Sequence, residues 1–125
     1  MLNRKIWQAL LSCLLLIGQP VNANEENRIM FKTGQDLIDL CTADDALMIG
    51  QCIGYVMAIV DYDSVLEARN LKPQEFCLSK EAVLETALIP VIGFLSEQKR
   101  SDLAGLSASG FVNIALRKKF PCGLR

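Results

Sequence analysis

The sequence contains no histidine among its 125 residues. This absence excludes Ser-His-Asp triads, Cys-His catalytic pairs, histidine-bearing zinc sites and histidine-based pH switches. There is no run of five basic residues and the formal net charge is −1, so the electrostatic signature of a nucleic-acid-binding protein is missing. No CxxC pair is present, which excludes a thioredoxin-like redox motif. We therefore expect no nucleic-acid partner and no metal site.

The remaining candidate acids and bases are carboxylates, and their spacing does not favour catalysis. Asp61 and Asp63 are two residues apart, so they point to different sides of a helix. Solvated or capping roles account for them better than a pair of catalytic acids would. Ser79 and Ser107 are expected to cap helices, because no base is available to activate a serine nucleophile. The residues thus predict neither an enzyme nor a cofactor site.

The N-terminus has the pattern of a secretory signal peptide. Arg4 and Lys5 are followed by an apolar run, Ile6–Ile17, and by small or compact residues at 21 and 23. This pattern predicts cleavage after Ala23. The run is too short to span a bilayer well. We therefore expect residues 1–23 to be a signal peptide and residues 24–125 to be a single exported domain with no membrane partner after cleavage.

Four cysteines remain after the signal peptide: Cys41, Cys52, Cys77 and Cys122. An even number of cysteines in an exported chain predicts disulfide bonds. Of the three possible connectivities we favour Cys41–Cys52 with Cys77–Cys122. The first would join the end of a short helix to the next helix, and the second would tie the chain's end to its middle. By loop entropy, the long bridge would contribute about 4 kcal/mol.

Apolar spacing predicts an all-α protein, a small disulfide-stapled bundle of four to five helices. No alternating strand pattern of useful length is present. The expected helices run from the cap Thr33 to about Cys41, from Asp44 to about Ala68, from the cap Ser79 through a kink or split at Pro90, and from the cap Ser107 to Lys119, with one further turn at Ser101 and Asp102.

The second of these helices is expected to be the buried centre of the fold. Residues 46–60 are apolar almost all round, with Gln51 as the interruption, which is typical of a central helix. Small residues recur every four positions along it, at 46, 50, 54 and 58, and would let another helix approach closely. The buried side of the last helix is expected to contain Phe111, Val112, Ile114, Ala115 and Leu116.

The order of several short motifs is more specific than any one of them. The motifs are TGQDL at 33–37 followed by Cys41, CIGY at 52–55 followed by Asp61, an isolated Cys77, and FPC at 120–122. This arrangement resembles the Rap/Tai family of periplasmic immunity proteins, which protect bacteria against amidase effectors of type VI secretion. The resemblance spans nearly the whole mature chain.

The resemblance implies a periplasmic helical protein without catalytic activity or cofactor, often a homodimer. Its cognate partner would be a papain-like peptidoglycan amidase whose active site it covers. The runner-up is a periplasmic acid-stress chaperone, which would loosen when its carboxylates are protonated. A hydrolase that uses aspartates alone is a weaker third hypothesis.

The inhibitory surface is expected on a connection, because the helix faces are mostly committed to the core. A blocker of a narrow cleft must offer a slim, polar, projecting segment. The preferred segment contains Gln98, Lys99, Arg100, Ser101, Asp102, Gly105 and Ser107. The alternative loop contains Arg69, Asn70, Lys72 and Gln74.

Overall fold

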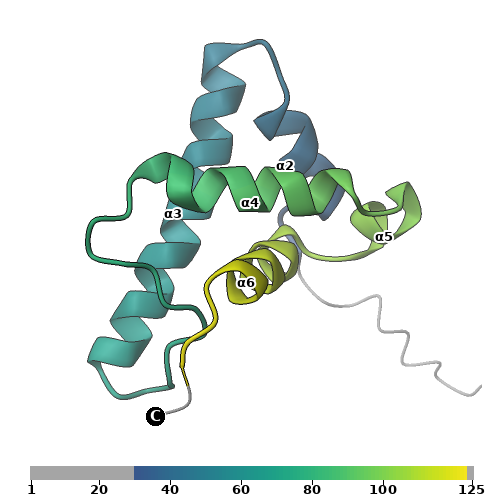
Figure 1. Ribbon diagram of the computed structural model, residues 1–125. Coiled ribbons are helices and arrows are strands. Elements are labelled where there is room, and N and C mark those ends of the chain that lie inside the picture. Colours follow the sequence, from purple (N-terminus) through teal and green to yellow (C-terminus); the bar gives the residue numbers. More distant parts are fainter. Residues whose placement is uncertain (1–29, 124–125) are drawn as a thin grey trace, which may run out of the picture.

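The structure, a computed structural model, describes residues 30–123, so the predicted signal peptide lies outside the described residues. Within that range 66% of the chain is helical and no strand is present, which confirms the predicted all-α class (Figure 1). The five helices are α2 (Gly34–Cys41), α3 (Ala46–Ala68), α4 (Leu84–Ser96), α5 (Arg100–Gly105) and α6 (Ala108–Lys119).

Three helices begin at the side-chain caps that their sequences favour. The Thr33 hydroxyl accepts the N–H of Asp36 at 3.2 Å, and the Asp36 carboxylate accepts the N–H of Thr33 at 2.8 Å, which forms a reciprocal capping box. The Asp36 carboxylate also accepts the hydroxyl of Thr33 at 2.8 Å. The backbone N–H of Thr33, and after it this hydroxyl, lower the pKa of Asp36 by donating to its carboxylate. Asp45 caps α3 and Ser107 caps α6. The predicted starts of α2, α3 and α6 are therefore confirmed.

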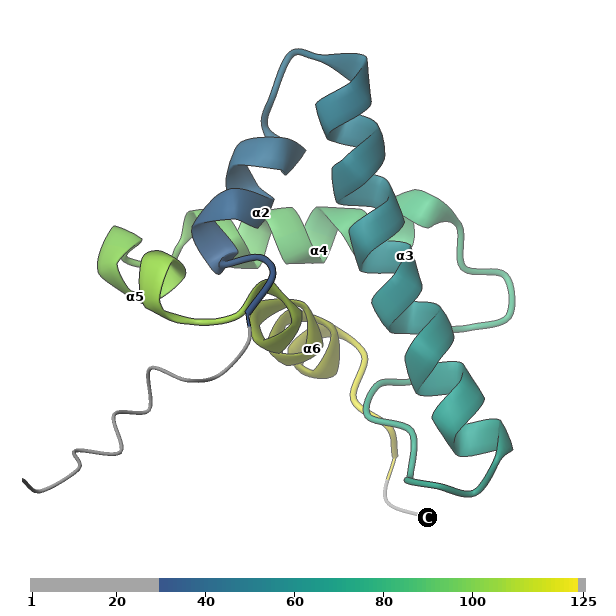
Figure 2. The ribbon, with the colours of Figure 1, turned by 180° about the vertical axis from the view of Figure 1, so that it is seen from behind.

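Helix α6 is the centre of the fold. It contacts α2, α3 and α4, and it lies among them in Figures 1 and 2. Its buried residues are Ala108, Phe111, Val112, Ala115 and Leu116. Ile114, also predicted to be buried, is 44% exposed. The prediction was wrong because the apolar face of α6 is narrower than its sequence suggested, and Ile114 lies at its edge.

Helix α3 is not the buried centre that its apolar sequence predicted. Its fully buried residues are Cys52, Val56 and Asp63, and a Cβ at Gly50 or Gly54 would meet nothing within 4 Å. At 23 residues the helix is about 34 Å long, much longer than the helices beside it. They cover one side of it, and its other side is uncovered in Figure 2, where α3 passes in front of α4.

The third predicted helix starts later than expected. Ser79 does not cap α4; it closes a single turn in which its carbonyl accepts the N–H of Ala82 at 3.1 Å. The chain is then extended at Val83, and the hydroxyl of Thr86 accepts the N–H of Val83 at 3.2 Å. Pro90 lies inside α4 without splitting it. Packing of buried residues on both sides of the proline offsets the hydrogen bond that it removes.

Both predicted disulfide pairs are confirmed. Cys41 and Cys52 have Cα atoms 5.1 Å apart and join the end of α2 to α3. Cys77 and Cys122 have Cα atoms 5.0 Å apart and join the segment after α3 to the chain beyond α6. The first bridge therefore fixes the N-terminal third of α3, and the second fixes the segment that follows its C-terminal end.

The contact between α2 and α6 depends on a missing side chain. A Cβ built on Gly34 would lie 2.5 Å from Cε2 of Phe111 and 3.0 Å from Cδ2 of Leu103. Real Cβ atoms essentially never approach other atoms so closely. Helix α2 can therefore start against α6 because residue 34 is glycine.

Gly34→Ala should lower the free energy of unfolding by about 1–3 kcal/mol, because the added methyl group overpacks the Phe111 site. The matched control is Gly93→Ala, since a Cβ at Gly93 in α4 meets nothing within 4 Å among the described residues. That control should be neutral or stabilising by up to about 1 kcal/mol, because alanine is the better helix former. Urea denaturation measures both. Equal stabilities for the two variants would contradict this packing.

Candidate binding surface

The preferred binding segment, residues 98–107, forms one end of the molecule. Helix α5 projects there, beyond the end of α4 (Figure 1). The exposed members of the predicted set are Lys99, Arg100, Ser101, Asp102 and Gly105. The two half-buried members have structural roles instead: the Gln98 amide donates to the carbonyl of Phe94 at 2.8 Å, and Ser107 caps α6.

This projecting segment is held to the body at several points. Leu103 is 6% exposed, and its side chain joins the hydrophobic core and so anchors α5. Beyond α5, the N–H of Gly34 donates to the carbonyl of Leu106 at 3.0 Å, and the N–H of Ala108 donates to the carbonyl of Lys32 at 2.9 Å. These contacts place residues 32–34 antiparallel to residues 106–108. The Cys77–Cys122 bridge lies beyond the far end of α6, so it fixes that end of the helix and does not touch this segment.

Sequence reasoning missed Leu106 as a member of this surface. Its side chain is 57% exposed, next to the polar residues of α5. The backbone pairing with residues 32–34 turns the chain here, and the side chain faces outward. An exposed leucine on a connection leaves no periodic signal in the sequence, and its exposure follows from the pairing with residues 32–34.

The alternative loop follows α3 and lies at the opposite end of the molecule from α5 (Figure 1). The structure therefore does not bring the two candidate segments together. Arg69 and Asn70 are exposed, and Asn70 has a φ of 54°, which asparagine tolerates better than most residues. Lys72 and Gln74 are less available, because both contact neighbouring groups.

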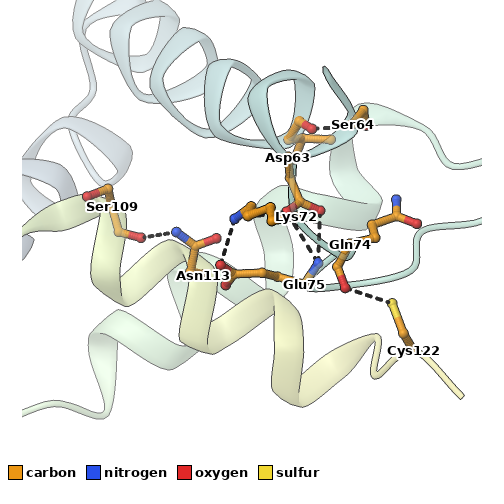
Figure 3. A network of polar contacts seen from close by, with 9 residues as sticks. Asp63, Ser64, Lys72, Gln74, Glu75, Ser109, Asn113 and Cys122 are labelled. Atoms are coloured by element: carbon orange, nitrogen blue, oxygen red, sulfur yellow. Dashed lines mark hydrogen bonds and ion pairs between the residues drawn. The ribbon is translucent and has the colours of Figure 1, made fainter. Parts of the chain in front are cut away.

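A polar network around Asp63 fixes this loop (Figure 3). Asp63 is 2% exposed, and its two carboxylate oxygens accept the N–H of Glu75 at 3.3 and 3.2 Å. The Lys72 ammonium lies 2.7 Å from Glu75 and 3.5 Å from Asp63. The hydrogen bond to Glu75 is the main cause that raises the pKa of Lys72. Asp63 thus positions a loop residue that lies 12 positions later in the chain. The sequence did not indicate this partner.

Next to this network, the backbone of Gln74 packs against the second disulfide. Its carbonyl oxygen lies 3.7 Å from Sγ of Cys122 (Figure 3). A disulfide sulfur has no proton to donate, so this is a packing contact. Gln74 and Lys72 therefore belong to the support of the loop, which leaves Arg69, Asn70 and Leu71 as its exposed tip.

A second exposed feature is the outer side of α3, which sequence reasoning placed inside the core. Leu47 is 71% exposed, Tyr62 64% and Val65 50%. By length and composition alone α3 could cross a membrane, although core helices of folded domains pass the same test. In this structure its inner side packs on α2, α4 and α6. The sequence did contain a signal for this exposure, namely the length of the helix. The rest of so short a chain is not large enough to cover a helix of 23 residues on all sides.

A pocket of about 240 Å³ lies between α3 and the chain that leads into α4. It is lined mainly by apolar side chains, including those of Met57, Phe76 and Leu84, and no charged residue lines it. This pocket has no acid, base or cation that could act on a bound molecule. It is also separate from residues 98–107.

A family model described as Rap1a immunity proteins matches residues 33–122. The match begins at the residue that caps α2 and ends at the last cysteine of the second disulfide. The chain belongs to the Rap1a immunity protein family. This membership confirms the resemblance seen in the motifs. No curated protein matches the chain.

Membership in the Rap1a family implies that this chain binds a cognate effector. Immunity proteins of this family are typically periplasmic and generally non-catalytic. A surface that binds a partner is thus the functional feature of this chain. The candidates among the described residues are the projecting segment at residues 98–107, the exposed tip of the alternative loop at 69–71 and the outer side of α3.

Asp63→Ala should lower the free energy of unfolding by about 1–3 kcal/mol, because it leaves the partly buried N–H of Glu75 without its acceptor. Glu67→Ala is the control, an exposed carboxylate on the same helix; its effect should stay within about 0.5 kcal/mol. Thermal melts of both variants at pH 7 make the comparison. If Asp63→Ala has the same melting temperature as the wild type, the network around Asp63 does not stabilise the loop.

Proposed function

We propose that this protein is exported to the periplasm after removal of residues 1–23, and that it protects its producer by occluding the active site of a papain-like peptidoglycan amidase delivered by type VI secretion. Its membership in the Rap1a family carries this proposal. Two disulfides suit an oxidising compartment. A chain without histidine suits a protein that blocks chemistry rather than one that performs it.

The segment at residues 98–107 is the proposed inhibitory surface. Its exposed side chains offer both donors and acceptors: the cations of Lys99 and Arg100, and the carboxylate of Asp102. Leu106 adds an apolar contact beside them. The anchor at Leu103 and the backbone pairing with residues 32–34 fix the segment before binding, so little conformational entropy is lost on docking.

We also propose that the protein forms a homodimer. The large apolar residues on the outer side of α3 support this, because a side chain such as Leu47 gains about 1.5–3 kcal/mol when it moves from water into an apolar contact. The amidase surface and the dimer surface would then be separate, since α5 lies away from the outer side of α3 in Figure 2.

Arg100→Ala and Ser101→Trp should each weaken amidase inhibition at least tenfold, about 1.4 kcal/mol, without changing the melting temperature, because both side chains are exposed. The measurement is turnover of a muropeptide by the cognate amidase at increasing inhibitor concentration. Arg69→Ala, an exposed arginine on the alternative loop, is the control and should inhibit like the wild type.

Loss of inhibition by Arg69→Ala instead would move the site to the alternative loop. Full inhibition by all three variants would contradict occlusion by either connection. Protection of a client protein below about pH 3, without any inhibition of the amidase, would favour the acid-stress chaperone, because carboxylates are protonated there. Hydrolysis of muropeptide or glycan by the protein itself would favour the hydrolase.

A further inference from the structure

The exposed residues on the outer side of α3 follow a heptad pattern. Leu47, Gln51, Gly54, Ala58, Asp61 and Val65 are separated by alternating steps of four and three residues, and all six are exposed. We call these six residues the α3 seam. Steps of four and three keep residues on one line of a helix that packs against another helix. From Leu47 to Val65 the seam is about 27 Å long.

The seam has a symmetric order of residue types. Its end residues, Leu47 and Val65, are large and apolar. Its next residues inward, Gln51 and Asp61, are polar. Its central residues, Gly54 and Ala58, are small. Reading the seam from either end gives the same sequence of chemical types, which is the property that a surface needs to bind a second copy of itself around a two-fold axis.

We propose that the α3 seam joins two copies of this protein, with the two α3 helices antiparallel and the two-fold axis beside residue 56. This inference rests on the homodimer in the proposed function and assigns its interface. In this arrangement Leu47 faces Val65 of the partner subunit, Gln51 faces Asp61 of the partner subunit, and Gly54 faces Ala58 of the partner subunit.

The polar layer determines the direction of the pairing. In the antiparallel arrangement each Gln51 amide donates a hydrogen bond to a carboxylate, which is a favourable charge-assisted contact. A parallel arrangement would place two Asp61 carboxylates opposite each other, and like charges in one layer repel. Antiparallel helices also place the positive end of one helix dipole beside the negative end of the other.

The ends of the helix agree with this direction. Asp44 and Asp45 precede α3, and Arg69 follows it. Antiparallel pairing brings the acidic end of one helix beside Arg69 of the partner subunit. Glu67 is two positions beyond Val65, so it lies about 200° around the helix from the seam and takes no part. In the middle, where a Cβ at Gly54 meets nothing within 4 Å, the two backbones can approach closely.

A charge exchange across the seam tests both the interface and its direction. Gln51→Glu places a carboxylate against Asp61 of the partner subunit twice in each dimer, so the dimer dissociation constant should rise at least tenfold in low salt. Adding Asp61→Lys to the same chain converts both layers into opposite-charge pairs, and should lower the constant at least tenfold from that of the single variant. Sedimentation equilibrium of the mature chain measures all three.

Ile89→Glu is the control, because it adds the same charge at an exposed apolar residue on α4; its dissociation constant should equal that of the wild type. Helical content by circular dichroism verifies that each variant is folded. A wild-type protein that is monomeric at about 100 μM would overturn the proposal. So would a double variant no tighter than Gln51→Glu, or a monomer that floats with phosphatidylglycerol vesicles.

Amidase inhibition by the same samples separates the two proposals. A wild type that inhibits the amidase but sediments as a monomer contradicts both the homodimer and its α3 seam, and leaves the proposed inhibition supported. A dimer whose dissociation constant does not respond to the charge exchange contradicts the α3 seam alone. A wild type whose dimer follows the predicted charge exchange but which never inhibits any amidase contradicts the proposed function, and leaves the interface supported.

Discussion

The contact between Gly34 and Phe111 sets the arrangement of the rest of the molecule. Because residue 34 has no side chain, α2 begins directly against the ring of Phe111 in the central helix α6. The residues just before α2 then lie beside those just before α6, where backbone hydrogen bonds join the two segments. Leu103 packs at the same point and fixes α5 outside it. One close approach thus positions both the core and the projecting segment.

The length of α3 is the second constraint. A core built around α6 can cover one side of a 23-residue helix, and the rest of that helix is held by its attachments. The Cys41–Cys52 bridge joins α3 to α2. Asp63 joins the C-terminal half of α3 to the loop that follows the helix. By loop entropy the short bridge contributes about 3 kcal/mol. The apolar side that remains exposed is the side that we assign to a second copy.

The features that sequence predicted correctly are local or covalent. The capping box at Thr33 and Asp36 involves residues three positions apart, so its pattern is complete within one turn. The two disulfide pairs followed from the expected order of the helices. The features that sequence did not reveal depend on distant parts of the chain. Whether Ile114 or Leu47 is exposed depends on how many helices surround it. An apolar pattern shows that residues favour burial, but it does not show that the fold buries them.

The same limit applies to the binding surface. The polar residues of the projecting segment were visible in the sequence, but the backbone hydrogen bonds that hold it come from residues 32–34, about 70 positions earlier in the chain. Amide hydrogen exchange of the free protein and of its complex with the cognate amidase tests this surface most directly. We expect new protection at residues 98–107, with the exchange of residues 69–72 unchanged. Protection at residues 69–72, with residues 98–107 exchanging as in the free protein, would contradict this expectation.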